Sequence, residues 1–184
     1  MADSQETLAR TGGRPLNRIV YSADQIAARV REMGEEITEA IPAGEDLLVL
    51  GLLKGSFIFL SDLVRELKRP LQVDFLVASS YGSGTTSSGD VKLLYDPYAD
   101  FSGRHVVLVE DIVDSGTTLS RLVPMLEARS PRSLEICTLL HKHVAKDLVR
   151  EPRWVGFDAP HEFLIGYGLD HSEDFRNLPF IGSL

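Results

Sequence analysis

The sequence predicts an α/β fold in which a central parallel sheet is flanked by helices. Apolar runs of strand length recur along the chain with amphipathic segments between them, and one run, residues 106–109, leads directly into acids and a hydroxyl-rich turn. Continuous apolar strands that alternate with helices are typical of parallel sheets covered on both faces. The 184 residues suffice for one hydrophobic core. We therefore expect a single domain over 15–184 and a flexible N-terminal tail over 1–14.

The first amphipathic segment shows how the elements are assigned. Ile26, Val30, Met33 and Ile37 recur at intervals of three and four residues, which predicts a helix over 23–40 with one apolar face. The remaining expected elements, in chain order, are a strand at 46–53, a helix at 55–67, a strand at 73–78, a short strand at 91–95, a strand at 106–109 followed by a helix that carries Leu119, Leu122, Val123 and Leu126, a strand at 134–140 and a short strand at 163–165.

Composition and charge argue against several classes of function. The formal net charge of −8 disfavours nonspecific binding to nucleic acid, which depends on lysine and arginine. No apolar run approaches the roughly 20 residues that cross a membrane. Residues 1–14 lack the apolar stretch of a signal peptide, so we expect a cytoplasmic location. The single cysteine, Cys137, lies in an apolar run and is predicted to be a core residue.

The segment after the strand at 106–109 carries the strongest functional signal. Glu110 and Asp111 follow the strand directly, and Asp114 opens a Ser-Gly-Thr-Thr turn at 115–118 that leads into a helix. In open parallel sheets, ligands bind beyond the carboxyl ends of the strands, where a helix N-terminus favours an anion. Gly116 permits close approach of the backbone, so the turn suits a phosphate. The paired acids suit sugar hydroxyls or a hydrated magnesium ion.

A simpler interpretation is a capped helix without a ligand. Asp114 or Ser115 would then serve as the N-cap of the following helix. Capping accounts for one acid but leaves Glu110 and Asp111 at the end of an apolar strand unexplained. The turn is also neither a Walker loop nor a dinucleotide fingerprint, because the glycine patterns of both motifs are absent.

The stretch Val109 to Thr118 resembles the phosphoribosyl-pyrophosphate loop of the type I phosphoribosyltransferases. Further motifs are similar, in order and spacing, to the bacterial hypoxanthine-guanine branch of that family. They are Leu53-Lys54-Gly55, Ser80-Tyr81-Gly82, Lys142, and Phe163 to Asp170 with Arg176. The resemblance covers roughly residues 15–184. It implies the type I phosphoribosyltransferase fold, in which a small hood from the chain ends, here largely 150–184, covers the edge of the sheet.

The resemblance also implies a reaction. The 5-phosphoribosyl group of phosphoribosyl pyrophosphate would be transferred to hypoxanthine or guanine, giving IMP or GMP and pyrophosphate in purine salvage, with Mg²⁺ as cofactor. It further implies a homodimer or homotetramer, and a cis peptide bond between Leu53 and Lys54.

The roles that the resemblance implies fall on matched positions. Asp114 is the candidate general base, and Glu110 and Asp111 would bind the ribose hydroxyls. The other assignments are Ser115, Gly116, Thr117 and Thr118 for the 5′-phosphate together with Asp114; Lys54, Gly55 and Arg176 for pyrophosphate; Ser80 and Tyr81 for loop closure; Lys142, Phe163, Leu164 and Asp170 for the purine; and Glu110, Asp111 and Asp170 for the metal.

Three alternatives and two departures from the family pattern bear on this interpretation. The enzyme could prefer xanthine, because sequence fixes the contacts to the purine 2-position poorly. A regulator of the same fold that binds RNA needs a basic face, which the acidic charge balance disfavours. A metal site built from His141, His143, His161 and His171 is disfavoured because cysteine partners and helical His spacing are absent. Thr117 replaces a lysine found in some relatives, and Ser56 replaces a second glycine, which bears on affinity more than on function.

Overall fold

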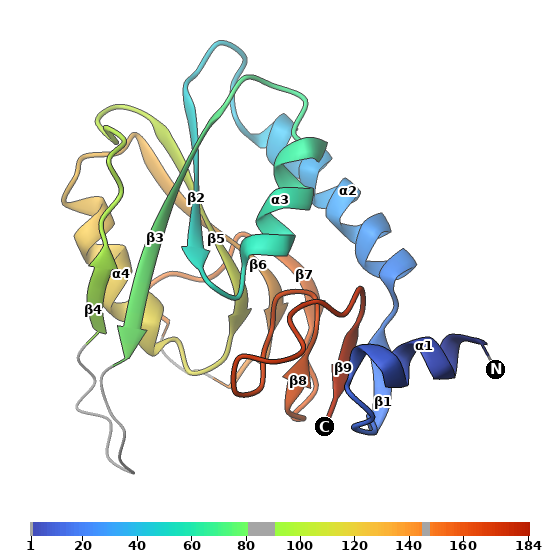
Figure 1. The fold of residues 1–184 in the computed structure, drawn as a ribbon. Helices are drawn as coiled ribbons and strands as arrows, with labels where there is room; N and C mark the ends of the chain where they lie inside the picture. The colour runs from blue at the N-terminus through green and yellow to red at the C-terminus, as the bar shows by residue number, and fades with distance from the viewer. Residues whose placement is uncertain (1, 81–90, 145–147) are drawn as a thin grey trace.

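Helices and strands alternate along most of the chain in the structure, a computed structural model that describes residues 2–80, 91–144 and 148–184 (Figure 1). The elements are α1 (Ala2–Arg10), β1 (Arg18–Tyr21), α2 (Ala23–Ala40), β2 (Leu47–Leu53), α3 (Phe57–Glu66), β3 (Gln72–Ser80), β4 (Val91–Tyr95), β5 (His105–Val113), α4 (Thr117–Glu127), β6 (Ser133–His141), β7 (Trp154–Asp158), β8 (Leu164–Ile165) and β9 (Ile181–Ser183).

A six-stranded sheet with the order β4-β3-β2-β5-β6-β7 forms the centre of the fold. All neighbouring strands in it run parallel except β4, which pairs antiparallel with β3 at one edge. The predicted α/β fold with a central parallel sheet is therefore confirmed, with an antiparallel edge strand that the sequence pattern did not indicate. Strand β2 is buried along almost its whole length, as expected for a strand covered on both faces.

Helices cover both faces of this sheet. Ser22 begins α2 with a capping box shared with Gln25, which satisfies backbone donors at the helix start. Helices α2 and α3 pack on one face through Ile26, Val30, Met33, Ile37, Phe59, Leu60 and Leu63. Helix α4 packs on the other through Leu119, Leu122, Val123 and Leu126. None of the helices that the structure describes is long and apolar enough to cross a membrane.

Both ends of the chain contribute to a second, three-stranded sheet with the order β1-β9-β8. It lies beside the edge of the central sheet where β5 and β6 end (Figure 1). The prediction drew the hood largely from 150–184, whereas this sheet also takes β1 from 18–21. Residues 2–10, which the prediction placed in a flexible tail, form helix α1. The local sequence of α1 supports a helix, since Glu6 and Arg10 pair one turn apart at 2.9 Å.

Strand β5 extends further than predicted. It was expected to end at Val109, where the apolar run stops, but it continues to Val113. Pairing with β6 carries it onward, because Glu110 stands opposite Thr138 and Val113 stands opposite His141. The acids therefore lie within the strand near its carboxyl end, not in the loop that follows.

Candidate active site

Glu110 is buried inside the central sheet. Its side chain is only 8% exposed, and its Oε2 atom has no hydrogen-bond partner among the described residues. Burial, and then the negative charge of Asp111, raise the pKa of Glu110 well above its usual range. A buried acceptor without a partner is costly, so this carboxyl group is available to a ligand that supplies a donor or a cation.

Asp111 is the second acid and faces the loop after β2. The backbone N–H of Ile112 donates to its Oδ1 atom at 3.0 Å. Burial raises the pKa of Asp111 to about 6, although backbone donors and the positive charge of Arg176 act in the opposite direction. A Cβ atom added at Gly55 would lie 1.6 Å from Asp111 Oδ2, so only glycine fits at this contact. Burial thus raises the pKa of both members of the acid pair, Glu110 and Asp111.

The turn between β5 and α4 has the form of an anion site. Gly116 is the N-cap of α4 with φ +73° and no side-chain cap, so the interpretation of Asp114 or Ser115 as the N-cap is wrong. Backbone N–H groups in the first turn of a helix have no partner within the helix. The hydroxyls of Ser115 and Thr117 lie 2.9 Å apart. The turn surrounds a cavity of about 80 Å³ lined by Glu110, Ile112, Val113, Asp114, Ser115, Gly116, Thr117, Thr118 and Leu119.

Lys142 and Asp114 meet at the ends of neighbouring strands. Lys142 follows β6, and its backbone N–H donates to the carbonyl oxygen of Val113 at 2.9 Å. Its Nζ atom donates to Asp114 Oδ2, also at 2.9 Å. Two groups assigned to purine chemistry from the sequence are therefore brought into direct contact.

Phe163 and Leu164 come from the second sheet. Phe163 is 52% exposed and makes a T-shaped contact with the His171 ring, with centroids 5.2 Å apart and planes at 87°. Its high exposure leaves ring surface on which a planar ligand could stack. Leu164 is buried in β8 and pairs with Ser183, so a ligand could approach its main chain but not its side chain.

Four charged residues form a second constellation, which we call the cation cluster: Lys54, Asp170, Glu173 and Arg176. Lys54 Nζ lies 2.9 Å from Glu173 Oε1. Arg176 Nη2 lies 2.9 Å from Asp170 Oδ1 and 3.3 Å from Glu173 Oε2. Lys54 follows β2 after a cis peptide bond with Leu53, as the resemblance implied. Arg176 is also fixed by donating to the carbonyl oxygen of Gly168 at 2.8 Å.

Close contact at glycine residues holds the segment between β8 and β9 against the loop after β2. Gly168 has φ +103°, and a Cβ atom there would lie 2.1 Å from the carbonyl oxygen of Gly55. Nearby, the Tyr167 hydroxyl donates to Asp62 Oδ2 of α3 at 2.6 Å. Burial, followed by this contact, raises the pKa of Tyr167. These contacts hold the cation cluster close to the acid pair.

The described structure brings together most of the side chains that the sequence assigned to the site. The chemical roles of these side chains stay predictions. Ser80 ends β3, and Tyr81 lies outside the described residues, so loop closure is not addressed. Sequence reasoning missed Glu173, and it named Gly168 only as part of a motif, without a role. Glu173 stands three residues from both Asp170 and Arg176, a spacing that could have signalled a local charge network.

The residues present fit a magnesium ion that arrives with its ligand. Within the described ranges, no three histidine, cysteine or carboxylate side chains gather as a ready metal site. The free Oε2 of Glu110 and the neighbouring Asp111 nevertheless supply the hard oxygen donors that magnesium prefers. Magnesium bound through phosphates needs only one or two carboxylates, which agrees with this donor set.

The histidines near Lys142 do not form a metal centre in the described structure. His143 Nε2 lies 2.6 Å from Asp158 Oδ1, and the rings of His141 and His143 are tilted at 41° with centroids 3.9 Å apart. Burial and the neighbouring His143 lower the pKa of His141.

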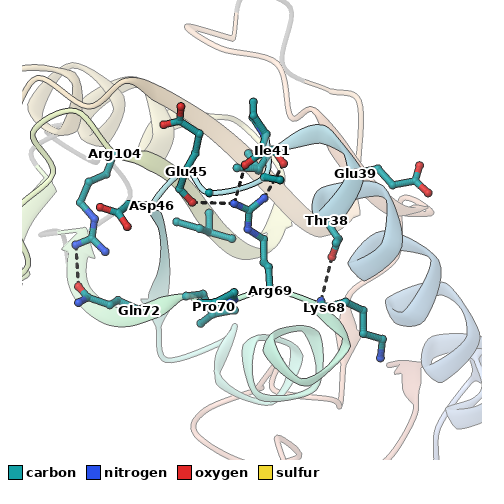
Figure 2. Close-up of a pocket in the computed structure, with 15 residues that line it drawn as sticks. Thr38, Glu39, Ile41, Glu45, Asp46, Lys68, Arg69, Pro70, Gln72 and Arg104 are labelled. Carbon is teal, nitrogen blue, oxygen red and sulfur yellow. Dashed lines mark hydrogen bonds between the residues drawn. The ribbon is translucent and has the colours of Figure 1, made fainter.

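A larger cavity lies away from these groups. It measures about 860 Å³ and lies at the amino ends of β2 and β3, whereas the candidate site is at the carboxyl ends. Figure 2 shows the Arg69 guanidinium bonded to main-chain oxygens of the α2–β2 connection. These bonds, to Ile41, Pro42 and Glu45, measure 2.6, 3.0 and 2.8 Å. Arg69 therefore anchors a connection, and size alone does not make this cavity the active site.

Comparison with known proteins decides the family. A model of the family described as "Phosphoribosyl transferase domain" matches residues 18–172. The chain belongs to the phosphoribosyltransferase family. Hypoxanthine-guanine phosphoribosyltransferase of Mycobacterium avium is 47% identical over 174 residues, which cover 92% of this chain and 86% of that protein. Hypoxanthine phosphoribosyltransferase of Escherichia coli is 46% identical over 161 residues, or 87% of this chain and 90% of that protein.

Solved structures of phosphoribosyltransferases agree with this assignment. A hypoxanthine phosphoribosyltransferase from Staphylococcus aureus superposes with a TM-score of 0.87 at 38% identity, covering 92% of this chain and 91% of that chain. A hypoxanthine-guanine phosphoribosyltransferase from Bacillus anthracis gives a TM-score of 0.87 at 40% identity, with 92% and 99% covered. The chain is thus a pentosyl-transferring enzyme with a type I phosphoribosyltransferase fold. Neither the xanthine-preferring nor the RNA-binding alternative is supported by these relatives.

Proposed function

We propose that this phosphoribosyltransferase transfers the 5-phosphoribosyl group of phosphoribosyl pyrophosphate to hypoxanthine or guanine. The bond between ribose C1 and a pyrophosphate oxygen breaks, and a bond between C1 and a purine ring nitrogen forms. The proton on that nitrogen passes to the enzyme, and pyrophosphate leaves. The products are IMP or GMP, as expected of purine salvage.

The contact between Lys142 and Asp114 carries the proposal. A 6-oxopurine needs a donor for its oxo group and a base for its ring N–H, and these two side chains meet at 2.9 Å. When the purine enters, Lys142 donates to the 6-oxo oxygen, and the freed Asp114 carboxylate accepts the ring proton. Such proton transfer typically contributes about 10²–10⁴-fold to the rate. Adenine is disfavoured because its 6-amino group would oppose the ammonium donor without an acceptor.

The acid pair and the α4 turn support ribose 5-phosphate binding. Glu110 has a free buried oxygen that can accept from a ribose hydroxyl. The first turn of α4, with hydroxyls at Ser115, Thr117 and Thr118, offers donors to the 5′-phosphate together with the helix dipole. Phe163 supplies an exposed ring for stacking on the purine.

Magnesium fits between the acid pair and the pyrophosphate. Glu110 and Asp111 would hold it from the ribose side, and Asp170 from the pyrophosphate side. When bound, the ion neutralises charge on the leaving pyrophosphate. Lys54, Gly55 and Arg176 would bind the same group directly, with arginine able to contact two phosphate oxygens at once. Ser80 and Tyr81 are proposed to exclude water by closing over it.

A substrate comparison tests the proposal. The purified enzyme is assayed by ultraviolet absorbance with phosphoribosyl pyrophosphate and Mg²⁺ against hypoxanthine, guanine, xanthine and adenine in turn. We expect turnover with hypoxanthine and guanine and little with adenine. Adenine as the best acceptor would overturn the role of Lys142, and xanthine as the best acceptor would overturn the stated substrate.

We also propose that the chain functions as one domain over 15–184 and as a homodimer or homotetramer. Phe57 of α3, Val73 and Phe75 of β3, and Tyr95 of β4 are each more than a third exposed, and a second copy of the chain would bury them. Sedimentation of the wild-type protein and of Phe75→Ser tests this, with dissociation expected in the variant. The cytoplasmic location stays a prediction.

A further inference from the structure

Glu173 occupies the space between the two cations proposed to bind pyrophosphate. Its Oε1 lies 2.9 Å from Lys54 Nζ, and its Oε2 lies 3.3 Å from Arg176 Nη2. One carboxylate therefore satisfies both cations at once, as the oxygens of a phosphate group would. Contact with Lys54, and then with Arg176, lowers the pKa of Glu173, so it is ionised at neutral pH.

The turn that carries Glu173 has an unusual backbone. His171 and Asp174 exchange two main-chain hydrogen bonds of 3.2 Å, which closes a tight turn. Its central residues, Ser172 and Glu173, have φ values of +54° and +69°. Turns with two positive φ values favour Asn and Gly, because a Cβ atom strains this conformation. Backbone strain of this kind is found where the position of a side chain serves function.

A further hydrogen bond fixes the same turn. The backbone N–H of Glu173 donates to Asp170 Oδ2 at 2.9 Å, while the other oxygen of Asp170 contacts Arg176. The carboxylate is thus directed at the two cations by its own backbone. It does not reach them by chance from a long, free side chain.

We propose that Glu173 determines the affinity of the enzyme for the pyrophosphate group, by acting as an internal counter-ion in the empty subsite. This inference rests on the proposed function, which assigns Lys54 and Arg176 to pyrophosphate. Phosphoribosyl pyrophosphate enters by displacing the Glu173 carboxylate from both cations. When pyrophosphate leaves, the carboxylate returns and neutralises them.

The charges explain why this arrangement favours a particular ligand. Glu173 carries one negative charge, whereas a pyrophosphate group carries several, so only a multiply charged ligand gains enough from both cations to displace it. The return of Glu173 also speeds release of the product pyrophosphate, because the cations need not be left unpaired. Glu173 is therefore a specificity-determining residue rather than a catalytic one.

Glu173→Gln tests the proposal, with Asp174→Asn as the matched control. Asp174 lies in the same turn and loses the same charge in its variant, but it contacts Arg14 at 2.7 Å instead of the two cations. Binding of inorganic pyrophosphate in the presence of Mg²⁺ is measured by calorimetry. Removing two exposed ion pairs predicts about threefold to tenfold tighter binding for Glu173→Gln. Asp174→Asn is expected to bind like the wild type.

Steady-state kinetics separate this role from a structural one. Glu173→Gln is expected to lower the KM for phosphoribosyl pyrophosphate and leave the KM for hypoxanthine unchanged. Glu173→Asp keeps the charge but shortens the reach by one methylene, so it should shift affinity in the same direction by less. Unchanged or weaker pyrophosphate binding in Glu173→Gln, or an equal shift in Asp174→Asn, overturns the inference. Failure of the wild type to bind pyrophosphate, with Lys54→Met no different, would instead overturn the proposed site.

Discussion

The acid pair and the cation cluster form two sides of one candidate site. They differ in how deeply their charged groups are buried and in whether those groups are already paired. Glu110 is buried, with a free oxygen and a pKa raised well above normal. Lys54 and Arg176 lie nearer to solvent and are already paired with Glu173 and Asp170 at 2.9–3.3 Å. One side carries buried carboxyl groups, one of them with a free oxygen, whereas on the other side the protein's own carboxylates pair with the cations.

The difference shows what a ligand must bring. A magnesium complex of phosphoribosyl pyrophosphate carries a cation for the acid pair and anionic oxygens for the cation cluster. Under the proposed function, we expect binding to relieve the desolvated acids on one side and to replace internal counter-ions on the other. We therefore expect free energy to be gained mainly at the acid pair and the choice of anion to be made at the cation cluster.

The largest expected effect lies at Asp114, which belongs to neither side and follows β5 where it contacts Lys142. We expect Asp114→Asn to lower kcat by about 10²–10⁴-fold, because an amide cannot accept the purine proton. The KM for phosphoribosyl pyrophosphate should change far less, because the substitution leaves both the acid pair and the cation cluster intact. Steady-state kinetics check both values. Asp96→Asn, at an exposed carboxylate paired with Arg129, is the control, and an unchanged kcat in Asp114→Asn would remove the residue from this role.

A smaller effect is expected from the cation cluster. Lys54→Met removes a charged donor, so we expect the KM for phosphoribosyl pyrophosphate to rise about 10- to 100-fold while the KM for hypoxanthine is unchanged. Lys68→Met is a matched control, because Lys68 lines the 860 Å³ cavity at the opposite edge of the sheet. An equal rise in this KM in Lys68→Met would show that the 860 Å³ cavity affects substrate binding. It would contradict the assignment of pyrophosphate binding to the cation cluster.

The acid pair should make binding depend on pH. With the pKa of Asp111 at about 6, its ionised fraction falls about tenfold per pH unit below that value, and affinity for magnesium and phosphoribosyl pyrophosphate should fall with it. Calorimetry between pH 7 and pH 5 measures this. Since the substrate phosphates also titrate, Asp111→Asn is measured beside the wild type and should lack the Asp111 step. Parallel profiles for the two proteins would contradict the prediction.

The smallest expected effect is on stability. Folding raises the pKa of Asp111 from 3.8 to about 6, so ionisation costs stability that is absent below pH 3.8, grows as pH rises through this window, and is complete above it. Asp111→Asn should therefore raise the free energy of unfolding at pH 7 by ~1–2 kcal/mol, below the ~3 kcal/mol ceiling at 1.36 kcal/mol per pKa unit. Thermal unfolding should shift by roughly 5 °C.

Two controls make that stability prediction specific. The gain of Asp111→Asn over the wild type should vanish well below pH 3.8, where the carboxyl is protonated in both states. Asp114→Asn should give no gain at any pH, because Asp114 is more than half exposed and paired with Lys142. A destabilised Asp111→Asn at pH 7 would mean that hydrogen bonds, not desolvation, dominate at this acid.

Sequence reasoning succeeded where a single periodicity determines an element. The helix over 23–40 is confirmed to the residue, because its apolar spacing is regular and Ser22 and Pro42 bound it. It failed where long-range pairing decides. β1 and β9 are short strands that pair with each other across almost the whole chain. No local sequence pattern predicts such a pair of strands.

The candidate site shows the same division. The acid pair and its turn were found from the sequence because charged residues next to an apolar strand are conspicuous. The end of β5 was misjudged, since polarity was taken to end a strand that backbone pairing with β6 continues. Glu173 was missed because its significance depends on a backbone turn that points it at Lys54, 119 positions away in the chain.

The contact between Gly55 and Gly168 limits how the site can evolve. Any side chain at Gly55 would meet Asp111, and any at Gly168 would meet the main chain of Gly55. This side of the site, at Gly55 and Gly168, is therefore formed by peptide groups, and a point mutation does not change the chemistry of a peptide group. An inhibitor that hydrogen-bonds to these peptide groups would face little escape through resistance mutations, because a side chain at Gly168 would collide with the main chain of Gly55, and one at Gly55 would displace Asp111.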